Sequence, residues 1–164
     1  MVRKVHKARK INRLLAIDPG TRKAGYAIFE NGLYLCSDVI IIKNKKLTWL
    51  QRVDFIIIEI TQLLKHFKID IVVIEEPQLF IGSRKGRAAS NSGSVLKLTA
   101  LVHSIRIICR IKKIKVYLIP VRKWKGTVPK AITQKRIKRH LGIDITQLDE
   151  SDAVGLGLWY VRNS

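Results

Sequence analysis

Apolar residues in the first quarter of the chain form short runs separated by turn signals. The first run ends at Asp18 and is followed at once by Pro19-Gly20, a dipeptide that turns the chain. Asn31-Gly32 lies between the next two runs and is a strong hairpin signal. The pattern therefore predicts three successive antiparallel strands, over residues 13–18, 24–30 and 33–42.

The chain then changes from a strand pattern to a helix pattern. Between residues 47 and 67 apolar side chains recur at spacings of three and four, which predicts an amphipathic helix. Its expected inward-facing residues are Leu50, Val53, Ile57, Ile60, Leu64 and Phe67. Residues 69–75 form a continuous apolar run typical of a buried strand. A strand, a helix and a strand of these lengths favour a right-handed crossover to a parallel neighbour.

The second half continues this alternation after a polar loop. Ser94, at the end of the loop, is the expected N-cap of a second helix. The apolar face of that helix would comprise Leu98, Leu101, Val102, Ile105 and Ile108. The remaining predicted elements are a strand over 116–119, a basic loop over 122–130, and helices over 130–141 and 149–162. Gly155 and Gly157 lie inside the last helix; each costs a helix about 1 kcal/mol relative to alanine, so we expect close packing against the sheet there.

This order of elements predicts an α/β fold. The sheet would be mixed and five-stranded, an antiparallel meander extended by two parallel strands and flanked by helices. The length of 164 residues suits one domain, over 13–164, behind a basic N-terminal arm over 1–12. The arm is charged like the start of a signal peptide, but the apolar run behind it is short and carries Asp18.

Charge narrows the range of functions. The formal net charge is +20, from 32 Lys and Arg against 12 Asp and Glu, and it is spread over the whole chain. Such a balance favours an extended nucleic-acid surface, with an acidic membrane surface as the second interpretation. No stretch approaches the roughly 20 uncharged apolar residues of a membrane-spanning helix. Cys36 and Cys109 lie within apolar runs, which indicates reduced core thiols in an intracellular compartment such as cytoplasm, nucleoid or organelle matrix.

Half of the few acids fall in three short places. Asp18 ends the first strand, Glu75-Glu76 end the fourth, and Asp149, Glu150 and Asp152 open the last helix. Taken singly, each has a plain explanation, because turns favour acidic residues and a helix dipole stabilises acids in its first turn. If the fourth strand lies parallel to the first, however, Asp18 and the glutamates reach the same edge of the sheet.

Converging carboxylates repel one another unless a cation neutralises them. Oxygen ligands without His or Cys select hard ions, Mg²⁺ or Mn²⁺. A carboxylate-lined site with two such ions supports hydrolysis of a phosphodiester. The sequence therefore favours a metal-dependent nuclease with a basic nucleic-acid surface.

Four motifs in order resemble the RuvC-type Holliday-junction resolvases, especially the compact phage-like members, within the ribonuclease H-like superfamily. They are Ile17-Asp18-Pro19-Gly20-Thr21 with Gly25-Tyr26, Ile74-Glu75-Glu76-Pro77-Gln78, Trp124-Lys125-Gly126 with Pro129-Lys130, and Asp149-Glu150-Ser151-Asp152-Ala153 with Gly155-Leu156-Gly157. The resemblance implies a ribonuclease H-like fold and a homodimer that cuts opposed strands of four-way DNA junctions.

The resemblance also implies roles for particular residues. Two Mg²⁺ ions, replaceable by Mn²⁺, would be bound by Asp18, Glu75, Asp149 and Asp152. Successive strand residues face opposite ways, so only one of the two glutamates points inward, and Glu75 follows the Ile run as the family's glutamate does. A lysine near the scissile phosphate is expected, with Lys125 and Lys130 as the candidates.

The expected nucleic-acid contacts follow the basic loops. They comprise Phe80, Arg84, Lys85, Arg87, Arg122, Lys123, Trp124, Lys125, Lys130 and Lys135. Bacterial relatives insert an aromatic side chain into the junction shortly after the glutamate, and here Gln78 and Leu79 precede Phe80. Trp124 has two interpretations of equal weight, a base-stacking platform or a buried anchor for its loop.

Three other functions are compatible with parts of the pattern. Asp18-Pro19-Gly20-Thr21 also resembles the first phosphate loop of sugar-kinase and actin-like ATPases, which need a second domain. A junction-binding protein without catalysis has the same fold but no need for four carboxylates. A nuclease for flaps or RNA–DNA hybrids shares the metal site, so the sequence separates it poorly from a junction resolvase.

Overall fold

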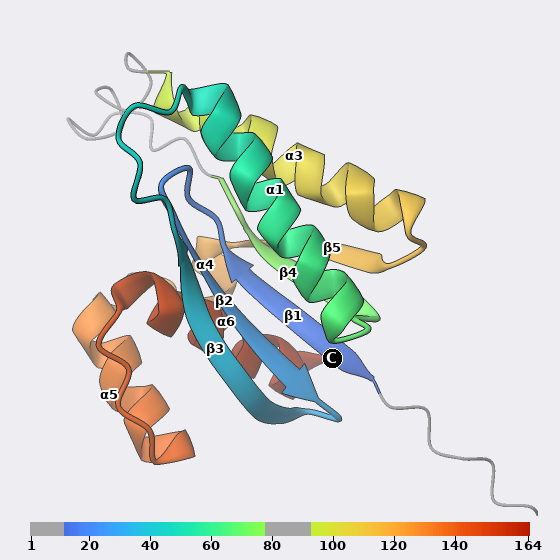
Figure 1. Ribbon diagram of the computed structural model, residues 1–164. Helices are drawn as coiled ribbons and strands as arrows, with labels where there is room; N and C mark the ends of the chain where they lie inside the picture. Colours follow the sequence, from blue (N-terminus) through green and yellow to red (C-terminus); the bar gives the residue numbers. More distant parts are fainter. Residues whose placement is uncertain (1–11, 78–92) are drawn as a thin grey trace, which may run out of the picture.

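A mixed sheet forms the centre of the computed structural model, which describes residues 12–77 and 93–164 (Figure 1). Its strands are β1 (Arg13–Asp18), β2 (Lys23–Glu30), β3 (Leu33–Ile41), β4 (Ile71–Glu76) and β5 (Lys115–Pro120). The five strands lie side by side in the order β3-β2-β1-β4-β5. The predicted basic arm falls almost wholly outside the described residues.

The strand pairing is the one the sequence predicted. β1 pairs antiparallel with β2, and β2 with β3, while β4 and β5 extend the sheet in parallel from β1. Asn31 and Gly32 turn the β2–β3 hairpin with φ angles of 52° and 82°, which is the left-handed conformation such a turn requires. Ile17 of β1 is paired with Ile74 of β4, so the two strands reach the same edge of the sheet together.

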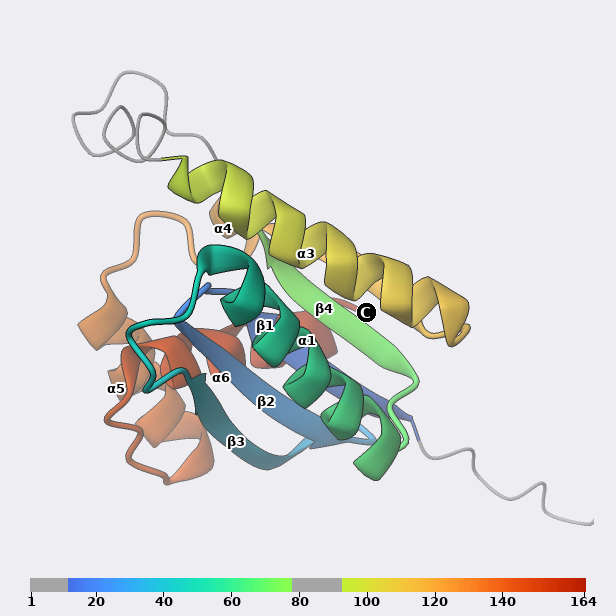
Figure 2. The ribbon, with the colours of Figure 1, turned by 45° about the horizontal axis from the view of Figure 1, so that its top comes forward.

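Helices cover both faces of the sheet. They are α1 (Trp49–His66), α3 (Ser94–Ile111), α4 (Val121–Trp124), α5 (Lys130–Leu141) and α6 (Leu148–Asn163). α1 and α3 lie on one face, α6 lies on the other, and α5 is beside α6 (Figures 1 and 2). Within the described residues, no helix is both long enough and apolar enough to cross a bilayer.

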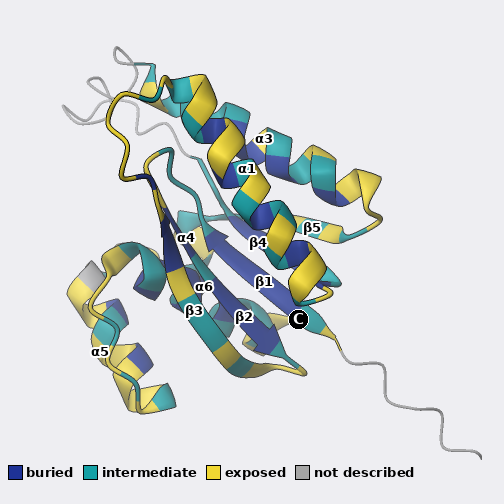
Figure 3. Cartoon of the chain, viewed as in Figure 1, coloured by how far each residue is buried: buried dark blue, intermediate teal, exposed yellow. Residues whose placement is uncertain are grey.

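The alternation of strand side chains divides the core in two. On β4, Val72 and Ile74 pack toward α1 and α3, whereas Val73 packs toward α6. On β1, Ile17 belongs to the α1–α3 side and Ala16 to the α6 side. Figure 3 shows the result: the central strands β1, β2 and β4 are mostly buried, and the outer surfaces of the helices are exposed. This alternation decides on which face each strand-end acid lies.

Three details of the sequence prediction are wrong. Leu50 is 56% exposed, because the helix begins at Trp49 and its buried stripe runs through Val53, Ile56, Ile60 and Leu64. Ser94 is not the N-cap: it is the first residue of α3, and Gly93 precedes it with a φ of 65°. The segment predicted as a basic loop after β5 begins with the short helix α4. Four residues are too few to show a helical periodicity in the sequence.

Both glycines of α6 allow close packing, but only Gly157 packs against the sheet, as predicted. A Cβ added at Gly157 would lie 2.1 Å from Cε2 of Phe29, a fully buried side chain of β2. Gly155 faces Trp124 and Thr133 instead of the sheet, and a Cβ there would lie 2.9 Å from Cζ3 of Trp124. α6 therefore lies closer to both neighbours than an alanine would permit.

We predict that Gly157→Ala lowers the free energy of unfolding by about 1–3 kcal/mol, because the new methyl group overlaps a buried ring. Urea unfolding monitored by circular dichroism measures this change. Gly157→Ala combined with Phe29→Leu should lose less than the sum of the two single changes, since the smaller side chain makes room. Strict additivity would contradict the proposed overlap.

Candidate active site

Two acids stand at the same edge and on the same face of the sheet. Asp18 directly follows Ile17 on β1, and Glu75 directly follows its partner Ile74 on β4. By strand alternation Asp18 lies on the face of Ala16, and Glu75 on the face of Val73, which is the α6 side in both cases. Glu76 falls on the opposite face.

The beginning of α6 lies against this edge. Gly25 pairs with Asp18 in the sheet, and a Cβ on Gly25 would lie 2.0 Å from the backbone oxygen of Asp149. Only glycine permits this approach, which sets the first turn of α6 beside the end of β1. Asp149 and Asp152 are three residues apart and share one side of the helix.

The third acid of this helix turn has a different partner. Oε1 of Glu150 accepts a hydrogen bond of 2.6 Å from Oγ of Ser37 on β3. Ser37 Oγ is also 2.9 Å from the hydroxyl oxygen of Tyr34. This contact directs the Glu150 side chain toward β3. Asp152, in contrast, is buried, with an exposure of 3%.

α4 and the residue after it contact two of the acids. Nε1 of Trp124 donates a hydrogen bond of 3.1 Å to Oε2 of Glu75. Nζ of Lys125 forms an ion pair with Oδ1 of Asp152, and the two side chains are only 10% and 5% exposed. The same ammonium lies 5.3 Å from the centroid of the Trp124 ring, within the range of a cation–π contact. Lys125 is therefore a buried cation next to the carboxylates.

Chain geometry explains why α4 is so placed. β5 is parallel to β4, with Pro120 opposite Glu76, so the chain leaves β5 at the edge where the glutamates lie. The amides of Lys125 and Gly126 both bond to the carbonyl of Val121, at 2.9 and 3.1 Å, which closes the short helix. Two consecutive side chains are thereby directed at Glu75 and Asp152.

The acids suit a hard divalent cation in chemistry, since they offer only oxygen donors. In residues 12–77 and 93–164, however, no three His, Cys, Asp or Glu side chains stand close enough together to hold one ion. Glu75 instead accepts a hydrogen bond from Trp124, and Asp152 forms an ion pair with Lys125. The strands and α6 bring oxygen donors to one edge of the sheet, and holding an ion between them would require their side chains to move.

Tyr26 of the first motif lies away from the carboxylates. It is on the α1 side of the sheet, where it lines a pocket together with Asp38 and Glu59. Burial, followed by the charge of Asp38, raises the pKa of the Tyr26 hydroxyl above its usual value. A raised pKa keeps the phenol protonated at neutral pH, so this side chain carries no charge.

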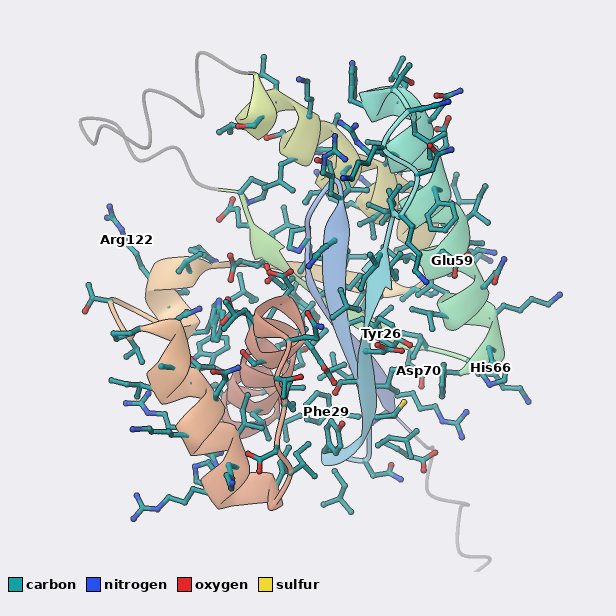
Figure 4. The ribbon with its side chains drawn as sticks, turned by 60° about the vertical axis from the view of Figure 1, so that its left-hand side comes forward. Tyr26, Phe29, Glu59, His66, Asp70 and Arg122 are labelled. Carbon is teal, nitrogen blue, oxygen red and sulfur yellow. The ribbon has the colours of Figure 1, made fainter. Side chains whose placement is uncertain are left out.

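An exposed cationic surface adjoins the site. Arg122 extends outward from α4 (Figure 4), and the other members are on α4 and α5. We call this set the α4–α5 basic surface; it comprises Arg122, Lys123, Lys135, Arg136 and Arg139. Arg136 and Arg139 were not among the predicted contacts, although their spacing from Ile132 and Lys135 puts them on one helix face. Lys138 is paired with Asp144 at 2.6 Å.

Several predicted contacts lie beyond what the structure describes. Phe80, Arg84, Lys85 and Arg87 fall outside the described residues. Lys130 is the first residue of α5, and its side chain is likewise not described.

The sheet order, the helices on both faces and the acids at the β1–β4 edge define a ribonuclease H-like protein. Solved structures agree. Thermus thermophilus RuvC in complex with Holliday junction substrate aligns with a TM-score of 0.72 and 17% identity, covering 93% of this chain and 96% of that one. The fowlpox virus Holliday junction resolvase aligns with a TM-score of 0.61 and 15% identity, covering 93% and 99%.

Sequence comparison identifies the family. The model of the crossover junction endodeoxyribonuclease RuvC family matches residues 14–157. RuvC of Campylobacter hominis is 31% identical over 162 residues, which cover 92% of this chain and 96% of the relative. A shorter match, to Hydrogenovibrio crunogenus RuvC, is 28% identical and covers 60% of this chain and 58% of the relative. The chain belongs to the RuvC family and is an endodeoxyribonuclease of this class.

We predict that Lys125→Met lowers the free energy of unfolding by about 3 kcal/mol in buffer with a chelator. The change leaves the buried Asp152 carboxylate without its ammonium partner. Chemical denaturation at neutral pH measures it.

Lys123→Met is the matched control, because Lys123 is exposed two residues earlier and its loss should cost no more than about 0.5 kcal/mol. Lys125→Met with Asp152→Asn should recover part of the loss, since both charges are then removed. Equal stabilities of the two single lysine variants would show that the ion pair contributes nothing.

Proposed function

We propose that this protein resolves four-way DNA junctions by hydrolysing phosphodiesters in two opposed strands, with two Mg²⁺ ions bound by Asp18, Glu75, Asp149 and Asp152. The observation that carries the proposal is the convergence of these acids from β1, β4 and α6 at one edge, beside the α4–α5 basic surface. The relatives whose structures contain Holliday junction DNA support the choice of substrate.

The donor set gives each part of the chain a role. Bound Mg²⁺, or Mn²⁺ in its place, would activate water and stabilise the attacking and leaving oxygens of the phosphodiester. Asp18 and Glu75 offer ligands from rigid strand ends, and Asp149 and Asp152 offer them from the first helix turn. Lys125 is paired with one of these acids, so its ammonium would meet the charge of a scissile phosphate once Asp152 binds metal. Lys130 remains the second candidate for that role.

The α4–α5 basic surface would hold the DNA backbone. Its cations are exposed, and no acid lies in the first turn of α5 to offset them. Contacts from Arg and Lys to phosphates give affinity and orientation but carry no base information. Phe80, Arg84, Lys85 and Arg87 are proposed to add contacts from the segment before α3.

Paired cleavage requires two active sites, and we propose that two copies of the chain supply them. The outer faces of α1 and α3 carry exposed apolar side chains that support such an association. They include Leu50 at 56%, Ile58 at 55%, Ile107 at 58% and Ile111 at 75% exposure. Contiguous exposed apolar patches mark protein interfaces, and α1 and α3 are in contact with each other.

The thiols fit the proposed reducing intracellular compartment. Cys109 is buried in the core, and burial raises the pKa of its thiol to about 11. Burial likewise raises the pKa of Cys36. Both side chains therefore stay as thiols at neutral pH; Cys109 acts as a small core residue, and Cys36 is partly buried against the same core.

Cleavage of a four-way junction should be at least about 100-fold faster than cleavage of a linear duplex with the same sequences, because only the branched substrate can engage two sites at once. Purified protein, Mg²⁺ and end-labelled substrates on a denaturing gel provide the measurement. Mn²⁺ should replace Mg²⁺, and a chelator should stop the reaction.

Flaps and RNA–DNA hybrids are the informative comparison substrates. Similar rates on these and on the junction would favour a general ribonuclease H-like nuclease. Tight junction binding without cleavage of any substrate would favour the binding protein instead.

The carboxylate assignment makes its own prediction. Asp18→Asn and Glu75→Gln should each lower the cleavage rate by at least about 100-fold, since even changes to the partners of metal ligands cost 10–100-fold. Junction binding, measured by gel shift with Ca²⁺, should persist. Glu76→Gln is the matched control, because the side chain of Glu76 lies on the other face of the sheet. Loss of cleavage in the Glu76 variant, with activity kept in the Glu75 variant, would reverse the assignment.

A further inference from the structure

We infer that Trp124 is a positioning residue for the metal ligands: its indole N–H fixes the orientation of the Glu75 carboxylate. The direct observation is the hydrogen bond of 3.1 Å from Nε1 of Trp124 to Oε2 of Glu75. The inference rests on the proposed function, because it takes Glu75 as a metal ligand.

Packing determines where the indole N–H points. One side of the ring meets α6 at Gly155, where an added Cβ would lie 2.9 Å from Cζ3 of Trp124 and 3.0 Å from Cγ2 of Thr133. Thr133, from α5, is itself buried. Trp124 also belongs to the core cluster on the α6 side of the sheet. The ring is therefore confined by two helices while its nitrogen faces the strand end.

The chemistry of the donor suits a metal ligand. An indole nitrogen donates a hydrogen bond, accepts none and carries no charge. Oε2 has a second lone pair, and Oε1 has two, so the hydrogen bond from Trp124 uses only one of the four acceptor positions of the carboxylate and can persist when a metal ion binds. Lys125 differs, because its ammonium competes with a metal cation for Asp152.

Restricting a glutamate side chain to one rotamer costs conformational entropy. The hydrogen bond from Trp124 restricts the Glu75 side chain when the protein folds, so that metal binding does not have to restrict it. Partners that orient metal ligands typically contribute 10–100-fold to metal affinity or activity. Trp124 thus acts through Glu75 and need not touch the substrate.

The test compares Trp124→Phe with Trp159→Phe. Phenylalanine keeps most of the ring but has no N–H donor, and Trp159 lines the same pocket of about 260 Å³ as Trp124. Calorimetric titration with Mn²⁺, in the absence of DNA, should show about 10-fold weaker binding for Trp124→Phe and a change of no more than about twofold for Trp159→Phe. The Mg²⁺ concentration for half-maximal cleavage should rise in parallel, with the rate at saturating Mg²⁺ nearly kept.

A second measurement begins with the wild-type protein. Trp49, Trp124 and Trp159 give three indole N–H signals in a ¹⁵N-labelled sample. Addition of Mg²⁺ should shift the Trp124 signal in step with metal occupancy, because the acceptor Glu75 becomes a ligand. The shift should disappear in Glu75→Gln.

Three outcomes would overturn the inference. Equal Mn²⁺ affinity of the two tryptophan variants would remove the role of the N–H donor. A Trp124 signal that ignores Mg²⁺, while calorimetry detects binding, would separate the indole from the metal site. Absence of metal binding to the wild type in both experiments would refute the proposed metal site, and the inference with it.

Discussion

Repulsion between carboxylates gathered at one end of a sheet is the constraint on which this structure depends. Asp18 and Glu75 lie at the ends of neighbouring strands, and the acids of α6 lie at the beginning of the helix that packs against this edge. Opposite charge and hydrogen-bond donors are what make such a cluster tolerable. The chain supplies them locally, through the Lys125 ammonium, the Trp124 indole and the beginning of a helix, whose dipole favours negative charge. The cations of the α4–α5 basic surface, by contrast, stay exposed.

The alternation of side chains along the strands decides which acids lie on the same face of the sheet. Because side chains alternate, Glu75 shares a face with Asp18 while its neighbour Glu76 does not. Parallel pairing of β1 and β4 then brings the selected pair to the same edge. On the helix, a contact with Ser37 draws Glu150 toward β3 and leaves Asp149 and Asp152 on the shared side. Each choice follows from backbone geometry before any ligand is present.

Much of this was predictable from sequence, and the failures have physical reasons. Strands with continuous apolar runs and helices of many turns carry strong periodic signals, so the sheet, its order of pairing and the long helices were found. α4 has only four residues, too few for a period, and Leu50 lies at the first turn of α1, where the apolar stripe has not yet begun. The bond between Trp124 and Glu75 joins residues 49 positions apart and depends on how α5 and α6 confine a ring. No local pattern encodes that arrangement. Lys125 was expected near the substrate, but its ion pair with Asp152 appears only when α4 is placed against α6.

Gly25 shows how a residue without a side chain can determine where a helix begins relative to a sheet. The carbonyl group of Asp149 lies where a side chain at position 25 would begin. In a genetic selection for inactive proteins, almost any replacement at this position would displace the beginning of α6, and it would be recovered together with the acids themselves. A map of intolerant positions would then mark Gly25 as if it took part in the chemistry. Gly25 leaves room for the backbone of α6. Selection would therefore preserve the short distance between β2 and α6.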